Sequence, residues 1–446
     1  MNGLDWFFGL LVLVVAVVAL ERAARRFGFK VSPLFTLLGL ITLSGLLLHH
    51  PQSSLFLPSD GLYYSDWGER IAGMWEGNGV IDKPLWPGRG IVPLLVGILE
   101  FTLGAHTFSM IAIGSVATTF SYLLLKISAQ VAFGAQRLSW LPMVLFITGL
   151  PIVLYGGGIL RESYFWLGCA LTVLAVALYS KGRILKALGA FLVGGTVLLA
   201  IRSDLGLAII YTVLGAVALS GLMSGMRQKN IKTALQSAIT LVILLLSGPS
   251  LLDTVRPDWT PEQIEVTAMD LSRAEVATAI ERPEVGTPID PSTLSAERAE
   301  VGTPIDPSTL SAERAAWCQS AVLAKLVCEI SNSLPAVLVG PFPGELFTSP
   351  LSVALSVGTG HFLLVSSLAL LAFRWVPPGS HLFFTVLTLT GFATLLIIAA
   401  LLTNYGIIMR FRAVSEIFLF PLALLALENL FRRGRRDFQA TNSARD

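Results

Sequence analysis

The sequence has few charged residues, few histidines and few cysteines. Of its 446 residues only 13% are charged, whereas 54% are hydrophobic and the mean hydropathy is +0.72. A soluble domain usually carries about 25% charged residues, so this composition excludes a soluble fold of such length. The net charge of +2 gives no argument for a nucleic-acid partner. Lipid must therefore meet much of the surface, and we expect an all-α polytopic membrane bundle.

The cysteines and histidines form no cluster with the spacing of a zinc site. Cys318 and Cys328 lie in an expected outer segment. They can form a disulfide there or remain two unpaired buried thiols, and the sequence does not decide between these alternatives. The histidines are scattered along the chain. We interpret His106, His361 and His381 as structural or interfacial residues rather than metal ligands.

Apolar runs predict about eleven membrane-spanning helices. We place them at 4–20, 33–48, 107–126, 139–156, 161–180, 184–201, 205–225, 231–248, 351–374, 381–403 and 412–430. Segment 91–104 is too short to span and carries Glu100, so we expect a re-entrant or interfacial helix there. The first span contains Asp5 and is followed by basic residues, a pattern that does not favour a cleaved signal peptide.

Lys and Arg concentrate in alternate loops, which predicts the orientation in the membrane. If the N-terminus lies outside, the inner loops and the C-terminal tail hold most of the basic residues. Examples are Arg25 and Arg26 after the first span and Arg435 and Arg436 in the tail. We therefore expect a multi-pass protein of the bacterial inner membrane with its N-terminus outside.

Two long outer segments divide the chain. The predicted N-terminal membrane module, 1–248, contains the first of them at 49–90, and the second occupies 249–350. The C-terminal spans and the basic tail follow at 351–446. Loops this long are usually functional or disordered.

The second outer segment contains a direct repeat. EVGTPIDPSTLSAERA at 284–299 recurs identically at 300–315, and its composition indicates a flexible insertion from a recent duplication. The apolar stretch 317–340 that follows is broken by polar residues, so we expect it to lie along the outer interface. It ends in GPFPGE at 340–345, whose prolines are expected to turn the chain back into the membrane.

The first outer segment combines carboxylates, basic residues and aromatic rings. The residues of interest are Asp60, Asp66, Lys83 and Arg89. Between Tyr64 and Trp75 an apolar stripe of Trp67, Ile71, Met74 and Trp75 recurs at helical spacing, so Asp66 is expected on the first turn of a helix at the water–lipid boundary. An aromatic belt with solvated charges explains the same composition.

Further arginines lie at the outer ends of spans that are far apart in the sequence. They are Arg161 beside Glu162, Arg202 beside Asp204, and the pair Arg410 and Arg412. Arginine near a membrane span is costly unless it pairs or lines a polar cavity. Each one can also snorkel or pair locally. Several guanidinium groups on one face suit an anionic lipid head group, because guanidinium binds phosphate oxygens in a bidentate manner.

Several short motifs carry a resemblance to a known family. They are SDWGERIAG with Asp66, PGRGIVPLLVGILEFTLG, GGGILRES at 156–163, LAIRSDLG at 199–206, GPFPGE and NYGIIMRFR at 404–412. In these motifs the chain resembles GT-C type membrane glycosyltransferases that use a polyprenyl-phosphate-linked sugar, related to the dolichyl-phosphate-mannose mannosyltransferase family.

The resemblance implies a function and a set of residues. Asp66, with Asp60 as the alternative, is implied as the general base on the acceptor hydroxyl, so Asp66→Asn is expected to abolish transfer. The arginines are implied to stabilise the leaving lipid phosphate, Arg410 and Arg412 first, then Arg202 and Arg161. The implied partners are a polyprenyl-phosphate-linked sugar, membrane lipid and a glycan, lipid or protein acceptor. The resemblance fixes no cofactor and leaves a divalent metal ion open.

The motif around Asp66 departs from the family. Trp67 follows Asp66 where the family often has Glu, and Arg70 stands near the expected Tyr position. Two other functions are therefore kept: a polysaccharide polymerase or ligase acting on lipid-linked oligosaccharides, and a transporter. A transporter needs polar residues near the bilayer midplane, and the third to eighth spans carry almost no charge there.

Overall fold

The computed structural model describes residues 2–48, 59–77, 90–134, 140–149, 152, 155–227, 230–255, 338, 350–401 and 405–443. Within these residues the chain is helical and contains no strand, which confirms the predicted all-α membrane bundle. Seven of the described helices are long and apolar enough to cross a membrane. The protein is therefore a multi-pass membrane protein.

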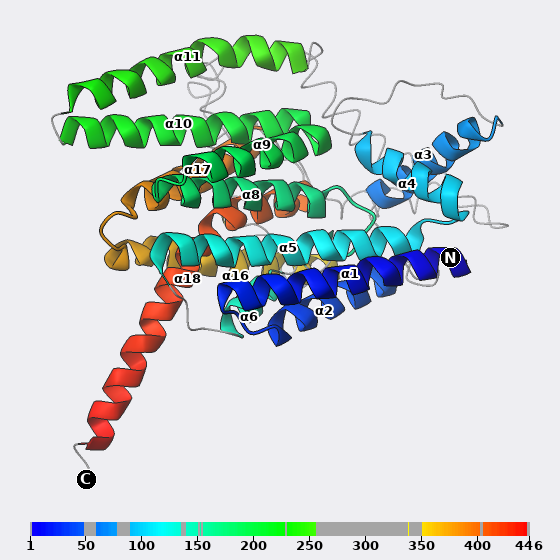
Figure 1. Cartoon of the computed structure of the whole chain (residues 1–446), viewed down its shortest axis with the longest axis horizontal. Helices are drawn as coiled ribbons and strands as arrows, with labels where there is room; N and C mark the ends of the chain where they lie inside the picture. Colours follow the sequence, from blue (N-terminus) through cyan, green and yellow to red (C-terminus); the bar gives the residue numbers. More distant parts are fainter. Residues whose placement is uncertain are drawn as a thin grey trace, which may run out of the picture. The chain divides into compact units, whose positions relative to one another are not determined.

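The helices carry the labels of Figure 1. Their bounds are α1 Gly3–Phe27, α2 Ser32–Leu48, α3 Ser59–Trp75, α4 Ile91–Leu103, α5 Thr107–Phe133, α6 Leu141–Ile147, α8 Glu162–Ser180, α9 Ile184–Ile201, α10 Ser203–Arg227, α11 Ile231–Val255, α16 Pro350–Leu371, η3 Ala372–Trp375, α17 His381–Leu401 and α18 Tyr405–Ser443. Every predicted span has a counterpart helix except 139–156. That segment contains the short helix α6, which ends at Ile147, so the prediction of one continuous helix there is wrong.

The chain forms two compact units. Unit 1 comprises Met1–Val255, Gly360–Thr394 and Ala413–Asp446, and unit 2 comprises Arg256–Thr359 and Leu395–Arg412. Helices α1 to α11 belong to unit 1, whereas α16, α17 and α18 have residues in both units.

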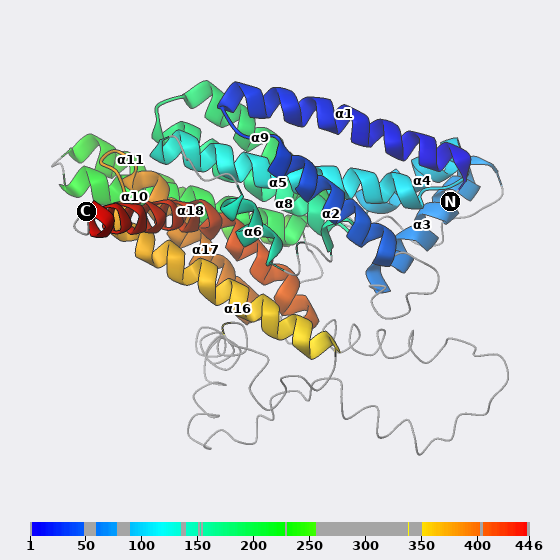
Figure 2. The same ribbon diagram turned by 90° about the horizontal axis from the view of Figure 1, so that it is seen from below.

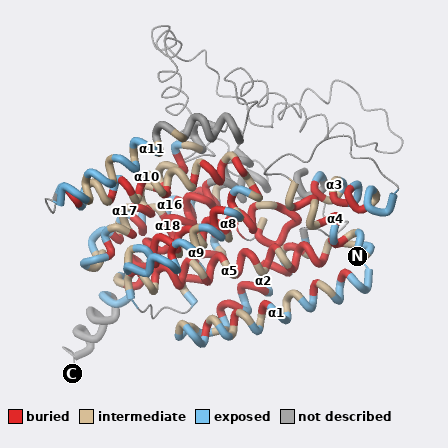
Figure 3. Tube along the Cα trace, turned by 45° about the horizontal axis from the view of Figure 1, so that its top comes forward, coloured by how far each residue is buried: buried red, intermediate tan, exposed pale blue. Residues whose placement is uncertain are grey.

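Helix α5 is the central helix of the N-terminal part of unit 1. It packs against α1, α2 and α8, and α8, α9, α10 and α11 follow as successive neighbours. α5 and α8 are buried along most of their length, whereas α1 is exposed along one side (Figure 3). From Leu4 to Val18 the exposed side chains of α1 are apolar, among them Leu10, Val14 and Val15. This is the surface that a helix facing lipid requires.

Polar contacts at both ends show that α1 and α5 run in the same direction. Near their starts, the Asp5 carboxylate accepts hydrogen bonds from the backbone N–H of Phe108 (3.0 Å) and of Ser109 (2.9 Å). Near their ends, the Gln130 amide donates to the carbonyl oxygen of Phe27 at 3.0 Å. The two helices lie side by side in Figures 1 and 2.

Close contacts at glycine residues show which ends of the following helices lie together. Gly114 of α5 lies against the segment that leads into α8, and Gly168 of α8 lies against Leu198 near the end of α9. Gly206 near the start of α10 meets the same residue, Leu198. The starts of α1, α5, α8 and α10 therefore share one end of unit 1. We call it the outer end, after the orientation predicted from the charges.

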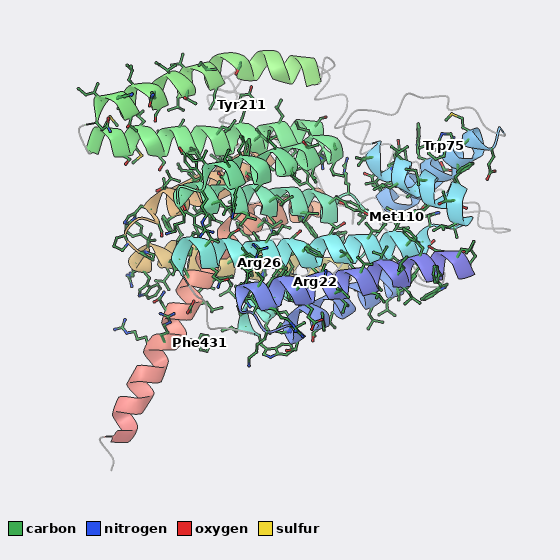
Figure 4. The ribbon with its side chains drawn as sticks, viewed as in Figure 1. Arg22, Arg26, Trp75, Met110, Tyr211 and Phe431 are labelled. Atoms are coloured by element: carbon green, nitrogen blue, oxygen red, sulfur yellow. The ribbon has the colours of Figure 1, made fainter. Side chains whose placement is uncertain are left out.

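Basic side chains mark the opposite, inner end of unit 1. Arg25 and Arg26 stand in the last turn of α1, and Figure 4 shows Arg22 and Arg26 toward that end of α1, away from Trp75 on α3. Lys181 follows α8 and donates to the Ser380 hydroxyl at 3.2 Å. The distribution agrees with the predicted alternation of loops.

Candidate functional site

A run of glycines carries the chain into the start of α8 at the outer end. The carbonyl oxygen of Gly156 accepts a hydrogen bond from the Thr118 hydroxyl at 3.1 Å. Gly157 lies so close to α2 that a Cβ there would stand 2.3 Å from the carbonyl oxygen of Ile41. Only glycine allows backbone to approach backbone at this distance. The run is thereby fixed against α2 and α5, and it leads directly to Arg161 at the N-cap of α8.

We expect Gly45→Ala in α2 to disturb this contact. The added Cβ would stand 2.2 Å from the carbonyl oxygen of Gly157, so the backbone must shift, and overpacking of this kind costs roughly 1–3 kcal/mol. Gly39→Ala is the matched control on the same helix, because nothing lies within 4 Å of its Cβ position and alanine favours the helix. The midpoint of thermal unfolding is the measurement. Equal midpoints for the two variants would contradict the contact.

Four charged side chains and one tyrosine gather near the outer end of unit 1. Arg161 and Glu162 stand at the start of α8, and Arg202 and Asp204 stand where α9 gives way to α10. Tyr64 comes from α3. All four neighbours act electrostatically on Arg202, so segments far apart in the sequence meet here.

Burial and charge together set the state of Arg202. Burial lowers the pKa of its guanidinium to about 10, and the charge of Arg161 lowers the same pKa. Asp204, Glu162 and Tyr64 act in the opposite direction. The Arg202 Nε lies 3.8 Å from the Asp204 carboxylate, and the Arg202 side chain is 17% exposed. Two guanidinium groups thus act on each other here, and one of them, Arg202, is largely buried beside a carboxylate.

The helix starts add to the positive potential of this group, which we call the arginine cluster: Tyr64, Arg161, Glu162, Arg202 and Asp204. The N-terminus of a helix carries a partial positive charge and unpaired N–H groups. α8 and α10 both begin at the arginine cluster, and each has a carboxylate in its first turn. Such an arrangement suits an anion at the membrane surface.

The structure places Asp66 differently from the sequence prediction. α3 begins at Ser59, so Asp66 lies in mid-helix and the prediction of a first-turn position is wrong. Its carboxylate is 57% exposed and pairs with Arg70 on the next turn at 3.0 Å. An exposed pair of this kind contributes little stability, and its carboxylate is open to solvent.

The predicted apolar stripe on α3 divides into two parts. Ile71 is buried, and it lies against Gly97 of α4. Met74 and Trp75 are exposed, at 38% and 40%. The expected interfacial segment 91–104 is helix α4, which packs along α3.

The remaining predicted residues are placed as follows. Arg412 belongs to unit 2, is 2% exposed and donates to the Thr359 hydroxyl at 2.6 Å. Asp60 and Arg410 lie on α3 and α18, and their side chains are outside the described residues. Also outside the described residues are Lys83, Arg89, the repeat at 284–315, the stretch 317–340 apart from residue 338, GPFPGE at 340–345, Cys318 and Cys328.

One polar group at the outer end was missed from the sequence. Nδ1 of His106 lies 2.7 Å from a carboxylate oxygen of Glu100, and Nε2 lies 2.9 Å from the Ser65 hydroxyl. The spacing of Glu100 and His106 around the Gly104 turn was the available signal, but nothing in the sequence places Ser65 beside them. Among the described residues, no cluster of three or more His, Cys, Asp or Glu side chains could hold a metal ion.

Comparisons with known proteins add no relative to this picture. No protein-family model matches the chain, and no curated protein matches it.

Proposed function

We propose that the protein is a membrane glycosyltransferase. It transfers a sugar from a polyprenyl-phosphate carrier to an acceptor at the outer face of the bacterial inner membrane, in the synthesis of a cell-surface polysaccharide or glycolipid. The observation that carries the proposal is the arginine cluster at the outer ends of the membrane helices. The motifs described above, which resemble GT-C type enzymes, give the reaction class.

The arginine cluster has the chemistry that the donor requires. As the bond between the sugar and the phosphate breaks, negative charge grows on the phosphate oxygens of the lipid. Arg202 is preorganised for that charge, because the Asp204 carboxylate lies 3.8 Å from its Nε, and Arg161 adds a second positive charge beside it. A site at the ends of apolar helices also leaves the polyprenyl chain in lipid while its phosphate reaches the protein.

A binding measurement tests the donor class before the sugar is identified. The full-length protein in nanodiscs is titrated with polyprenyl phosphate and with the corresponding polyprenol, which lacks the phosphate. We expect the phosphate to bind more tightly. Arg202→Gln should remove about tenfold or more of this preference, because a hydrogen bond to a charged group contributes about 1.5–3 kcal/mol.

Arg25→Gln is the matched control, because Arg25 is exposed at the inner end and pairs with Glu21. Equal binding of polyprenol and polyprenyl phosphate by the unaltered protein would overturn the proposal, as would a full phosphate preference in Arg202→Gln. The product formed from a polyprenyl-phosphate sugar then separates the alternatives. One added sugar supports the transferase, whereas joined repeat units indicate a polymerase.

A further inference from the structure

Three side chains are joined by hydrogen bonds at the outer end: Ser65 of α3, Glu100 of α4 and His106 before α5. We call them the serine relay. We propose that the serine relay removes the proton from the acceptor hydroxyl, with Ser65 touching the acceptor and His106 receiving the proton. This proposal rests on the proposed transfer reaction and names its base, a role that the sequence motifs imply for Asp66.

The fold brings the three side chains together by a close contact between α3 and α4 and by a tight turn after α4. Gly68 of α3 faces Val96 of α4, and a Cβ at Gly68 would stand 2.2 Å from Cγ1 of Val96. α4 then ends at Gly104, whose φ of 65° is a left-handed conformation suited to glycine. This turn directs His106 back over the last turn of α4, where Glu100 lies.

The hydrogen-bond chemistry assigns a direction to the proton. A carboxylate accepts only, so Nδ1 of His106 carries the proton that is donated to Glu100. In the neutral imidazole, Nε2 then has the lone pair that accepts the hydroxyl proton of Ser65, 2.9 Å away. A hydroxyl, an imidazole and an orienting carboxylate in this order form the arrangement that activates hydroxyl groups in enzymes.

Burial distinguishes the serine relay from the ion pair of Asp66. The His106 side chain is 8% exposed, and the Glu100 side chain is 27% exposed, whereas Asp66 is 57% exposed and already paired with Arg70. A preorganised base with little exposure loses less solvation when the acceptor binds. Ser65 is half-buried, whereas His106 behind it is buried.

Helix α3 links the serine relay to the arginine cluster. Tyr64 acts electrostatically on Arg202, and Ser65 is the next residue of the same helix. Neighbouring residues in a helix point about 100° apart. α3 therefore presents one side chain to the proposed phosphate site and the next to the proposed base. A glycosyl transfer needs an anion site and a base on either side of one sugar.

The reaction balances without any further reagent. The acceptor oxygen forms a bond to the anomeric carbon as the bond from that carbon to the phosphate oxygen breaks. The acceptor proton passes to Oγ of Ser65, and the original Ser65 proton passes to Nε2 of His106. The phosphate leaves with the bonding electron pair. The imidazolium is stabilised by Glu100, which is a positioning residue in this scheme.

A fluorophosphonate probe tests the serine relay without a sugar donor. Oγ of Ser65 attacks phosphorus, fluoride leaves with its electron pair, and the Ser65 proton passes to His106. We expect the full-length protein in nanodiscs to be labelled at Ser65, as identified by peptide mass spectrometry, and Ser65→Ala to lose this label. His106→Gln should slow labelling by about 100-fold, and Glu100→Gln by about tenfold.

Two further variants separate a chemical role from a structural one. Thr102→Ala removes another hydroxyl of α4, one that donates to the carbonyl oxygens of Ile98 at 2.6 Å and Leu99 at 3.4 Å within its own helix, and should leave the labelling rate unchanged. His106→Gly should regain labelling when imidazole is added, which a merely structural histidine would not allow. Absence of label at Ser65, or labelling that does not depend on His106, would overturn the serine relay. Either result leaves the phosphate-binding test of the proposed function unaffected.

Discussion

Replacing His361 by leucine is expected to lower the free energy of unfolding by roughly 3–5 kcal/mol, because the change leaves a buried charge without its partner. His361 of α16 and Glu416 of α18 lie 3.1 Å apart between Nδ1 and a carboxylate oxygen, and both side chains are almost fully buried. The second ring nitrogen, Nε2, lies 2.6 Å from the carbonyl oxygen of Leu145. Both neighbours of the ring are acceptors, so the ring donates from both nitrogens as an imidazolium.

The double variant His361→Leu with Glu416→Leu is expected to recover most of the lost stability. Removing both charges leaves no unpaired ion, and apolar replacements of buried pairs are often neutral or stabilising. His381→Leu is the control, because His381 is exposed at the start of α17, and a change there should stay within about 0.5 kcal/mol. Additive losses in the double variant would contradict a coupled pair.

A thiol-reactive dye provides the measurement. Cys169 is free and fully buried in α8, so it reacts only when the helix bundle opens. All variants are compared in a chain that also carries Cys318→Ser and Cys328→Ser, so that only the thiol of Cys169 can react with the dye. The expected order of unfolding midpoints places the single His361 variant lowest, the double variant above it, and the His381 variant with the unaltered protein.

The pair of His361 and Glu416 also bears on the alternative that the protein is a transporter. Glu416 and His361 lie within the apolar spans Arg412–Arg433 and Ser356–Trp375, and a polar pair inside a membrane is a candidate for ion or proton movement. Here both ring nitrogens are engaged, and the pair joins α16 and α18 to the end of α6. We therefore interpret it as a structural link that compensates for the short helix α6.

Hydropathy alone predicted the fold because membrane helices must be apolar and must satisfy their own backbone. The prediction was wrong at 139–156 because hydropathy reports composition and not conformation. The segment around Pro142 and Gly149 is apolar whether or not it is helical. The carbonyl oxygen of Leu145 accepts from the nearby Thr148 hydroxyl at 3.0 Å and from His361 at 2.6 Å. The contact with His361 joins residues far apart in sequence, and no local pattern encodes it.

The candidate site was predictable where neighbours in sequence are also neighbours in space. Arg202 and Asp204 stand at a helix boundary, and the topology predicted that Arg161 reaches the same end. The position of Asp66 was misjudged because the start of the helix was placed near Tyr64, whereas α3 begins a turn earlier at Ser59. The serine relay depends on the packing of α3 against α4, which is set by Gly68 and has no signature in the sequence.

Asp5→Ala is expected to cost about 3 kcal/mol, although Asp5 lies near the start of the chain. Its carboxylate is fully buried and accepts from the N–H of Phe108 and from both the N–H and the hydroxyl of Ser109. These are N–H groups of the first turn of α5, which have no partner within the helix. Alanine would leave them buried and unsatisfied, at about 1–3 kcal/mol for each group, and would remove a charge that favours the helix start.

Asp5→Asn should cost less than Asp5→Ala, because the amide retains one accepting oxygen but turns an NH2 group toward a donor. Asp66→Ala is the control for loss of a carboxylate, since its exposed ion pair with Arg70 is worth at most about 1 kcal/mol. Unfolding midpoints and dye access to Cys169 measure all three. If Asp5→Ala and Asp66→Ala have the same unfolding midpoint, α1 does not hold the start of α5. If the unfolding midpoint of Asp5→Ala lies well below that of Asp66→Ala, the buried carboxylate of Asp5 fixes the start of α5. It then also fixes His106, which directly precedes α5, and with it the position of the serine relay.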